Sequence, residues 1–468
     1  MTVSNMVLPI PGLSTNLVQE GLLQRAFQDG LAPSLQFRQE AIVEEVQENT
    51  GTEFFMSRPG LLPVVEEPLP AMGGDPPVYA PVYEQWAVVI QRWAGSRITH
   101  MPTSVVSNAN LLLRDIHQLG LQAGMSTNRI PRNTFFKAYA SGQSNMTIAG
   151  IAADTVIHVA SVNGFSDSVV SGVSVRPVPV STSFPIQVRI GIGAAAITRF
   201  VTAVALDNPA DVNGPGTLTL SVALGVGFAA RTPVVSAYAP VVLRAGGGES
   251  VDAITAGDIV TLQMFINSTN YLRSHNVRPH DDGFYHAYIS PACNSQLFAD
   301  NVVQRLNTAL PQGVQYAEGF IGTIAGLMFF MNTELPNARN TGTQTATGVN
   351  ATYGRSIGAE TVNEGGVAVG RALVTGKGAL YELGLDEKNY VSEAGITGKI
   401  GEFSITNGGI YVPVERVRLV LRAPIDALQD IVTASWSMTA GWACPTDATA
   451  TTGAQRYKRA VTVEYADQ

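Results

Sequence analysis

Apolar residues recur at spacings of three and four along Ser104–Ala123, and this pattern predicts the clearest α-helix of the chain. The apolar positions are Ala109, Leu112, Leu113, Ile116, Leu119 and Ala123. Pro131 follows shortly afterwards and has no backbone N–H to donate. We therefore expect this proline to kink or interrupt the helix before a last helical piece at Asn133–Tyr139.

A different pattern covers residues 143–250, where apolar and polar residues alternate in short runs. The segment is dense in valine, alanine, threonine, glycine and proline, and turn sequences such as Asn163-Gly164 separate the runs. Gly246-Gly247-Gly248 ends it as a flexible joint. Short strands at this spacing predict an inserted all-β domain, built as a sandwich or a barrel.

An α/β pattern resumes after residue 250. Thr255 and Asp258 form a capping box, which predicts that a helix opens there and runs through Leu272. Further helices are expected at Gln296–Leu306 and Asp426–Ala434. Strands are expected at Phe284–Ile289, Gly319–Met331 (with a turn), Val412–Leu421 and Arg459–Tyr465.

The first 85 residues do not form a core of their own. A short amphipathic helix fits Asn16–Asp29, but its apolar surface is too small to fold alone, so residues 1–50 are expected to be an arm packed on something else. Seven prolines punctuate residues 51–85 and exclude a central strand or helix there. Strand-like ends around a turn-rich tip predict a long projecting hairpin.

Composition points to assembly. Charged residues make up only 14% of the 468 residues, whereas about 25% is usual. So little charge leaves a monomer surface poorly covered, and we expect other subunits to cover much of it. A charge-poor, β-rich secreted protein is the alternative. The net charge of −8 argues against a general nucleic-acid binder, which should be basic.

Cysteines and targeting signals add further limits. The chain has two cysteines, Cys293 and Cys444, so no disulfide framework is expected, and folding in a reducing cytoplasm fits this count. The N-terminal sequence lacks the basic and apolar regions of a signal peptide. No apolar run approaches the roughly 20 residues of a membrane span, so no membrane partner is expected.

Candidate chemistry is sparse. The only compact group of metal-ligand types is His275, His280, Asp282 and His286, which is also explained as an ordinary polar turn between a helix and a strand. No phosphate-binding loop and no Gly-x-Ser-x-Gly elbow occurs. Cys293 and His286 could form a nucleophilic pair in principle, but packing explains both. We therefore expect no catalytic residue, no cofactor and no enzymatic activity.

The order of these elements resembles the major capsid proteins of tailed bacteriophages with the Hong Kong 97-type fold, and it is most similar to N4-like coat proteins. Four short stretches carry the resemblance, and their order matters more than any one of them. They are Leu272–Pro291, Gly319–Gly326 running on to Pro336, Ala372–Leu383 (ALVTGKGALYEL) and Asp426–Trp442.

That resemblance implies an α+β fold with a defined layout. The implied parts are an N-terminal arm (1–50), an extended E-loop (51–85), a peripheral domain with a spine helix (86–142), the inserted β-domain (143–250), an axial domain (251–400) and C-terminal strands of the peripheral domain (401–468).

The resemblance also implies a function. Copies of the chain would self-assemble into hexamers and pentamers of an icosahedral head, which encloses double-stranded DNA without sequence-specific binding. The implied partners are further copies and scaffolding, portal and decoration or cement proteins. The implied location is the virion, after assembly in the bacterial host cytoplasm. The alternatives are a β-rich adhesin and an encapsulin-type shell enclosing cargo protein.

One departure from the family can be argued from residues. Some relatives crosslink a lysine of the E-loop to a neighbouring subunit. This chain has five lysines, at 137, 377, 388, 399 and 458, and therefore none within residues 51–85. We expect the arm, the E-loop and the inserted domain to stabilise the shell without covalent bonds.

Overall fold

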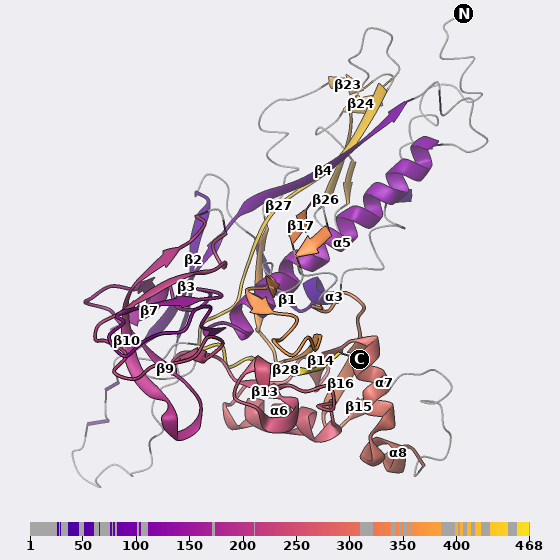
Figure 1. Cartoon of the computed structure of the whole chain (residues 1–468). Helices are drawn as coiled ribbons and strands as arrows, with labels where there is room; N and C mark the ends of the chain where they lie inside the picture. The colour runs from indigo at the N-terminus through magenta and orange to yellow at the C-terminus, as the bar shows by residue number, and fades with distance from the viewer. Residues whose placement is uncertain are drawn as a thin grey trace, which may run out of the picture. The chain divides into compact units, whose positions relative to one another are not determined.

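Figure 1 shows a computed structural model of the chain, an α+β fold with several separate sheets. It describes residues 26, 27, 29, 36–45, 51–59, 65, 75–76, 78–79, 82–100, 103, 111–170, 174–209, 211–308, 322–337, 343–345, 348–350, 353–354, 357–384, 398–400, 403–405, 410–412, 417–422, 431–447 and 456–467. Two compact units divide the chain. Unit 1 comprises Met1–Phe54, Val88–Arg132 and Tyr381–Trp442, and unit 2 comprises Phe55–Ala87, Asn133–Leu380 and Ala443–Gln468.

A six-stranded sheet organises unit 1, with the order β1-β22-β27-β26-β25 and β4 also paired to β27. Its strands are β1 (Ala41–Glu45), β4 (Gln91–His100), β22 (Leu380–Gly384), β25 (Ile410–Val412), β26 (Val417–Arg422) and β27 (Ile431–Ala443). The long strands β4 and β27 lie side by side, antiparallel, from Ile431 opposite His100 to Ala440 opposite Gln91 (Figure 1).

The expected helix at Asp426–Ala434 is wrong from Ile431 onward, because residues 431–434 belong to β27. This strand, IVTASWSMTAGWA, is rich in β-branched and aromatic residues that favour strands, and its ten-residue pairing with β4 outweighs a weak local helical pattern. Residues 426–430 lie outside the described part of the chain.

Helix α5 (Leu111–Tyr139) is the longest helix among the described residues, and it runs through Pro131 without ending. Of the expected kink or interruption at Pro131, the interruption is therefore wrong, and the kink stays a prediction. A proline inside a helix costs about 3 kcal/mol locally. Phe135, Phe136 and Tyr139 are fully buried after it, so packing of the last two turns in unit 2 offsets that cost. The predicted start at residues 104–110 lies outside the described residues.

The core of unit 1 lies between α5 and the sheet. Ile116, Leu119 and Ala123 of α5 are buried against Trp436 and Met438 of β27. Glycine at position 95 makes room for this indole, because a Cβ there would lie 2.6 Å from Trp436 Nε1. The helical positions predicted from the 3.6-residue pattern therefore do face a core.

The N-terminal segment is tied to unit 1 by a buried ion pair. Short helix α3 (Gln36–Gln39) places Arg38 against Glu382, with Nε to Oε2 at 2.8 Å and Nη2 to Oε1 at 2.7 Å. The Trp442 indole N–H also donates to Glu382, at 3.0 Å, and Phe37 N donates to the Asn128 side chain at 2.9 Å. Of the helix expected at Asn16–Asp29, only Ala26, Phe27 and Asp29 are described, and they are helical.

Unit 2 contains a mixed sheet with the order β13-β28-β21-β14-β16-β15. Its strands are β13 (Val242–Arg244), β14 (Tyr285–Ile289), β15 (Thr323–Ile324), β16 (Leu327–Met331), β21 (Val369–Thr375) and β28 (Ala460–Ala466). Three helices belong to the same core: α6 (Leu262–Ser274), α7 (Pro291–Ala299) and α8 (Asn301–Thr308). The strand-and-turn expected within Gly319–Met331 is confirmed for residues 322–331, which form β15 and β16.

Two helix predictions in this region need correction. The single helix expected at Gln296–Leu306 is two helices, because Asp300 ends α7 and its carboxylate then accepts the N–H groups of Val302, at 2.9 Å, and Leu262, at 2.8 Å. The Thr255–Asp258 bond forms, with Thr255 N to Asp258 Oδ2 at 2.7 Å, but it closes a separate turn. Helix α6 begins only at Leu262, since a bond that satisfies one turn does not oblige the chain to continue it.

Residues 143–236 build a six-stranded antiparallel sheet with the order β5-β12-β9-β10-β11-β6. Its strands are β5 (Gln143–Asn145), β6 (Val156–Val159), β9 (Ile186–Ile190), β10 (Ile197–Leu206), β11 (Gly216–Leu220) and β12 (Pro233–Ser236). A bridge between Met146 and Val159 joins the first strand to the last and closes the sheet into a barrel. Alternate residues of β9 point inward and are buried, as in a filled small barrel.

Not all of residues 143–250 belong to this barrel. Strands β7 (Asp167–Val170) and β8 (Ser174–Pro179) join β2 (Glu53–Pro59) and β3 (Tyr83–Val89) in the sheet β2-β3-β8-β7. Strand β13 pairs with β28 instead. Likewise β28 shares no sheet with β26 and β27, although the sequence-based layout groups residues 401–468 together. Long-range pairing partners decide these memberships, and local patterns do not reveal them.

The remaining described elements are small. Two-stranded pairs form between β17 (Thr343–Thr345) and β18 (Gly348–Asn350), β19 (Tyr353–Gly354) and β20 (Ala359–Glu360), and β23 (Gly398–Ile400) and β24 (Phe403–Ile405). Short 3-10 turns lie at Gly193–Ala195, Ala245–Gly247 and Val251–Ala253. Within the described residues, no helix has the length and apolarity that crossing a membrane requires.

Candidate functional site

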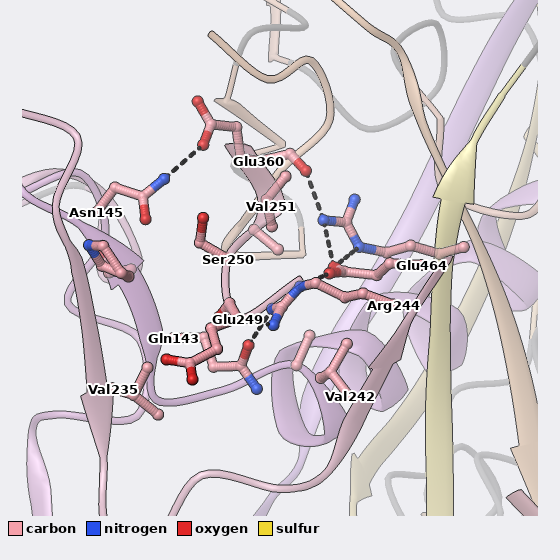
Figure 2. Close-up of a pocket in the computed structure, with 15 residues that line it drawn as sticks. Gln143, Asn145, Val235, Val242, Arg244, Glu249, Ser250, Val251, Glu360 and Glu464 are labelled. Carbon is pink, nitrogen blue, oxygen red and sulfur yellow. Dashed lines mark hydrogen bonds and ion pairs between the residues drawn. The ribbon is translucent and has the colours of Figure 1, made fainter. Parts of the chain in front are cut away.

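Among the described residues of unit 2, a group of buried and half-buried charges lies where the barrel meets the mixed sheet, and Figure 2 shows part of it. We call this group the charged junction. Its members come from the barrel, from the turn at 249–252 and from the sheet and its loops. They are Asn145, Arg231, Arg244, Asp252, Glu360, Arg371 and Glu464. Only tertiary pairing could assemble them, since they span more than 300 residues of sequence.

Arg231 forms the barrel side of the charged junction. It holds a left-handed backbone conformation, with φ of 69°, and donates from Nη1 to Glu360 Oε1 at 2.7 Å and from Nη2 to Asp252 Oδ1. The Asn145 amide donates to the same two carboxylates, at 2.9 Å to Asp252 and 3.1 Å to Glu360. Burial raises the pKa of Glu360, and Arg231 lowers it only in part. Arg231 is therefore the main compensation for a carboxylate held away from water.

Arg371, Glu464 and Arg244 form the sheet side of the junction. Glu464 is almost fully buried on β28 and accepts from Arg371 Nε at 2.9 Å and Arg244 Nε at 2.8 Å. Burial alone would raise the pKa of Glu464, but the two guanidinium groups outweigh it and lower that pKa. Arg371 also donates to the Glu360 backbone oxygen, at 2.5 Å, which links the two halves of the junction.

The cavity beside the charged junction is small. Asn145, Arg244, Glu360, Arg371 and Glu464 are among the residues that line it, and its volume is about 30 Å³. A water molecule needs roughly 10–15 Å³ of such volume, whereas ligand pockets span about 300–1,000 Å³. The charged junction therefore suits one or two waters and the joining of two parts of the fold, and it does not suit a substrate.

A second charge cluster fixes the base of the 53–89 hairpin within unit 2. Arg58 of β2 pairs with Glu84 of β3 and with Asp447, each at 2.5 Å, and Arg459 also pairs with Asp447 at 3.0 Å. Thr446 donates to Glu84 at 2.9 Å. Burial raises the pKa of Glu84. These bonds hold the start and end of the hairpin to the C-terminal segment.

The predicted metal residues are only partly brought together. The rings of His280 and His286 stack at 3.9 Å, with planes 9° apart, and His286 Nε2 lies 2.8 Å from Asp282 Oδ2. His275 packs elsewhere, with its ring on Tyr271 at 4.1 Å. An imidazole binds a metal in its own plane. Two nearly parallel rings therefore do not direct their nitrogens at one ion, and a shared ion would require one ring to turn.

The other properties of this segment fit a turn. Gly283 has φ of 84°, and its N–H donates to the His280 oxygen at 2.9 Å. Burial by itself would raise the pKa of Asp282, but the Phe284 N–H and His286 lower it. A chain reversal with an internally bonded aspartate accounts for the polar residues without a ligand.

The two cysteines are buried. Burial raises the pKa of both Cys293 and Cys444. A thiol is a nucleophile as its thiolate, so both side chains are poorly suited to that role at neutral pH. The pairing of Cys293 with His286 considered from the sequence gains no support from this environment.

Comparison with known proteins finds similarity to solved structures alone. No family model matches it, and no curated protein matches it. Similar solved structures include the capsid of cyanophage P-SCSP1u, with a TM-score of 0.46 and 13% identity over 93% of this chain and 89% of that chain. The capsid asymmetric unit of cyanophage Pam1 has a TM-score of 0.46 and 10% identity over 93% and 92%. The capsid of Ralstonia phage GP4 has a TM-score of 0.43 and 11% identity over 93% and 92%.

Proposed function

We propose that this chain is a major capsid protein of a tailed bacteriophage with the Hong Kong 97-type layout, a shell subunit without an enzymatic site. The observation that carries the proposal is the exposure of the side chains of strand β2. In the single chain, none of the side chains in this seven-residue strand is buried, although Phe55 is large and apolar and 66% exposed. Only one face of β2 is half-buried in its own subunit, and the opposite face, which carries Phe55, needs a neighbouring subunit to cover it.

The order of elements supports the same proposal. Along the chain come a docked N-terminal segment, the 53–89 hairpin, the long helix α5, a β-barrel, and a mixed sheet with helices α6 to α8. This is the order that the capsid resemblance implies for arm, E-loop, spine helix, insertion and axial domain. In this proposal the barrel within residues 143–250 is the inserted domain.

The exposed apolar side chains are a third observation that supports the proposal. Apolar residues of several strands remain exposed in the single chain, while only 14% of all residues are charged. Examples on unit 1 are Val89 and Ile98, which are 50% and 65% exposed. Exposed apolar side chains spread over many elements fit a subunit with many neighbours, as in hexamers and pentamers of a closed shell.

The proposal extends to location and partners. The chain would reside in the virion head around double-stranded DNA, and portal, scaffolding and decoration proteins would contact it during or after assembly in the host cytoplasm. Its acidic net charge of −8 fits an inner surface that does not bind tightly to packaged DNA.

Electron microscopy of the purified, expressed chain tests the proposal. Closed shells, or hexamers and pentamers, are the expected result. A matched pair of variants sharpens it: Phe55→Lys should block shell formation, whereas Val212→Lys, at another exposed apolar position, should not. A wild-type chain that stays monomeric at every concentration would refute the shell and favour a β-rich binding protein.

A further inference from the structure

One nitrogen atom of the charged junction is buried without a hydrogen-bond partner. Arg371 is fully buried on β21, where its Nε donates to Glu464 and its Nη2 donates to the Glu360 backbone oxygen. Its remaining nitrogen, Nη1, is buried with them and has no partner among the residues that the structure describes. A buried N–H group that bonds to no protein atom usually bonds to an ordered water or an ion.

A second polar group beside it is also unbonded. Ser250 is 6% exposed and lies just before the 3-10 turn Val251–Ala253, in an extended conformation with φ of −134° and ψ of 164°. A serine at such a position commonly bonds to the backbone of the turn that follows. Here the side chain makes no such bond, and no other described residue bonds to its hydroxyl.

Arg371 and Ser250 line the same cavity, and Figure 2 labels Ser250 in its wall. The volume of about 30 Å³ is enough for one or two waters. Two polar groups that lack protein partners thus border one small space, and they come from two different parts of unit 2, the mixed sheet and the turn at 249–252.

The charges in the wall of the cavity favour a neutral occupant. Two guanidinium groups (Arg244 and Arg371) and three carboxylates (Glu249, Glu360 and Glu464) line it. The excess of carboxylates disfavours an anion, and the N–H of a guanidinium disfavours a cation. A water molecule carries no charge, and it can accept a hydrogen bond from the arginine and donate one to the serine hydroxyl.

We propose that this cavity is a binding site for an internal water, which accepts from Arg371 Nη1 and donates to the Ser250 hydroxyl. The water links β21 of the mixed sheet to the turn whose Asp252 pairs with Arg231 of the barrel. A bond through an ordered water is nearly as favourable as a direct one, so the water is part of the joint between barrel and sheet. The site lies within one chain and does not rest on the proposed shell.

The matched variants Ser250→Thr and Ser250→Val test the site. Threonine and valine have the same shape, and the extended backbone at position 250 accepts both β-branched side chains. Threonine keeps the hydroxyl that binds the water, whereas valine removes it and places a methyl group against the cavity. The added bulk is common to both variants, so the difference between them reports the hydroxyl.

Urea unfolding of the full chain at neutral pH measures that difference. We expect an unfolding equilibrium constant about tenfold larger for Ser250→Val than for Ser250→Thr, because only valine leaves Arg371 Nη1 buried without a partner. A dry cavity gives the reverse order, because valine then fills apolar space while threonine buries an unbonded hydroxyl. Ser250→Val with stability equal to or greater than that of Ser250→Thr would overturn the proposal.

Magnetic relaxation dispersion of the solvent water counts the long-lived internal waters directly. The wild-type chain and Ser250→Thr should each hold more of them than Ser250→Val does. Equal counts in all three proteins would overturn the proposal even if their stabilities differ. Exchange of chloride for acetate at constant ionic strength tests the competing occupant. A wild-type stability that falls when chloride is removed would place an anion in the cavity and would also overturn the proposal.

Discussion

Replacing Arg231 with methionine gives the sharpest test of the charged junction. The variant keeps the length of the side chain and removes the guanidinium that pairs with Glu360 and Asp252. The Glu360 carboxylate is only 4% exposed, so losing its partner leaves a buried charge uncompensated. Breaking such a pair costs about 3–5 kcal/mol, and we expect the lower part of that range because Arg231 itself is 26% exposed.

The assay is thermal unfolding of the unassembled chain, followed by circular dichroism, with hydrogen exchange measured on peptides of the barrel. A loss of about 3 kcal/mol lowers the midpoint by roughly 6–12 °C for a domain of about 150–250 residues. Arg189→Met is the matched control, because Arg189 pairs with Glu249 at 3.0 Å but both side chains are nearly half exposed. An exposed pair of that kind contributes only about 0–1 kcal/mol.

The effect should also depend on pH. Burial raises the pKa of Glu360, and without Arg231 the pKa rises further. A carboxyl group with a raised pKa in the folded state is destabilising when ionised, so the penalty is present above that pKa and is relieved as the pH falls through it. The cost of Arg231→Met should thus be smaller at about pH 5 than at about pH 8.

The groups that face the Glu360 carboxyl are Arg231, Asn145, Asp252 and Arg371. Because glutamine carries no charge, Glu360→Gln in the Arg231→Met background should restore the free energy of unfolding. The reasoning would be refuted if Arg231→Met had the same melting midpoint as the Arg189→Met control. It would also be refuted if Arg231→Met lost the same stability at both pH values.

Three other predictions follow from the described residues. Gly95→Val should destabilise unit 1 by about 1–3 kcal/mol, because its Cβ would collide with the Trp436 indole; an unchanged melting midpoint would show that the indole can move aside. Isothermal titration with zinc should show no saturable site at His280 and His286, because their rings are parallel and do not direct their nitrogens at one ion. A stoichiometric zinc site that His280→Ala abolishes would contradict this prediction. Assembled shells should run as single chains on denaturing gels, since the hairpin has no lysine, and a covalent ladder would contradict that expectation.

Much of this fold follows from local pattern. The apolar spacing around Ile116 and Leu119 predicts a helix, and those residues do face the core. The alternation in residues 143–250 predicts short strands, and it is seen in β9, because a strand with one buried face must alternate. Turn residues such as Asn163-Gly164 separate the strands for steric reasons that act within a few residues. Composition also supports the proposed shell, because charged residues make up only 14% of the chain.

Other features depend on residues that meet only after folding. Pro131 stays inside a helix because aromatic side chains beyond it are buried, and residues 431–434 form a strand because β4 pairs with them. The charged junction joins Asn145 to Glu464, and neither its membership nor its raised and lowered pKa values can be read from spacing along the chain. The sequence alone determined the local elements, and its composition supports the proposed assembly. Tertiary structure decided which strands share a sheet, which charges are buried together and which apolar surfaces remain uncovered, because each depends on long-range contacts.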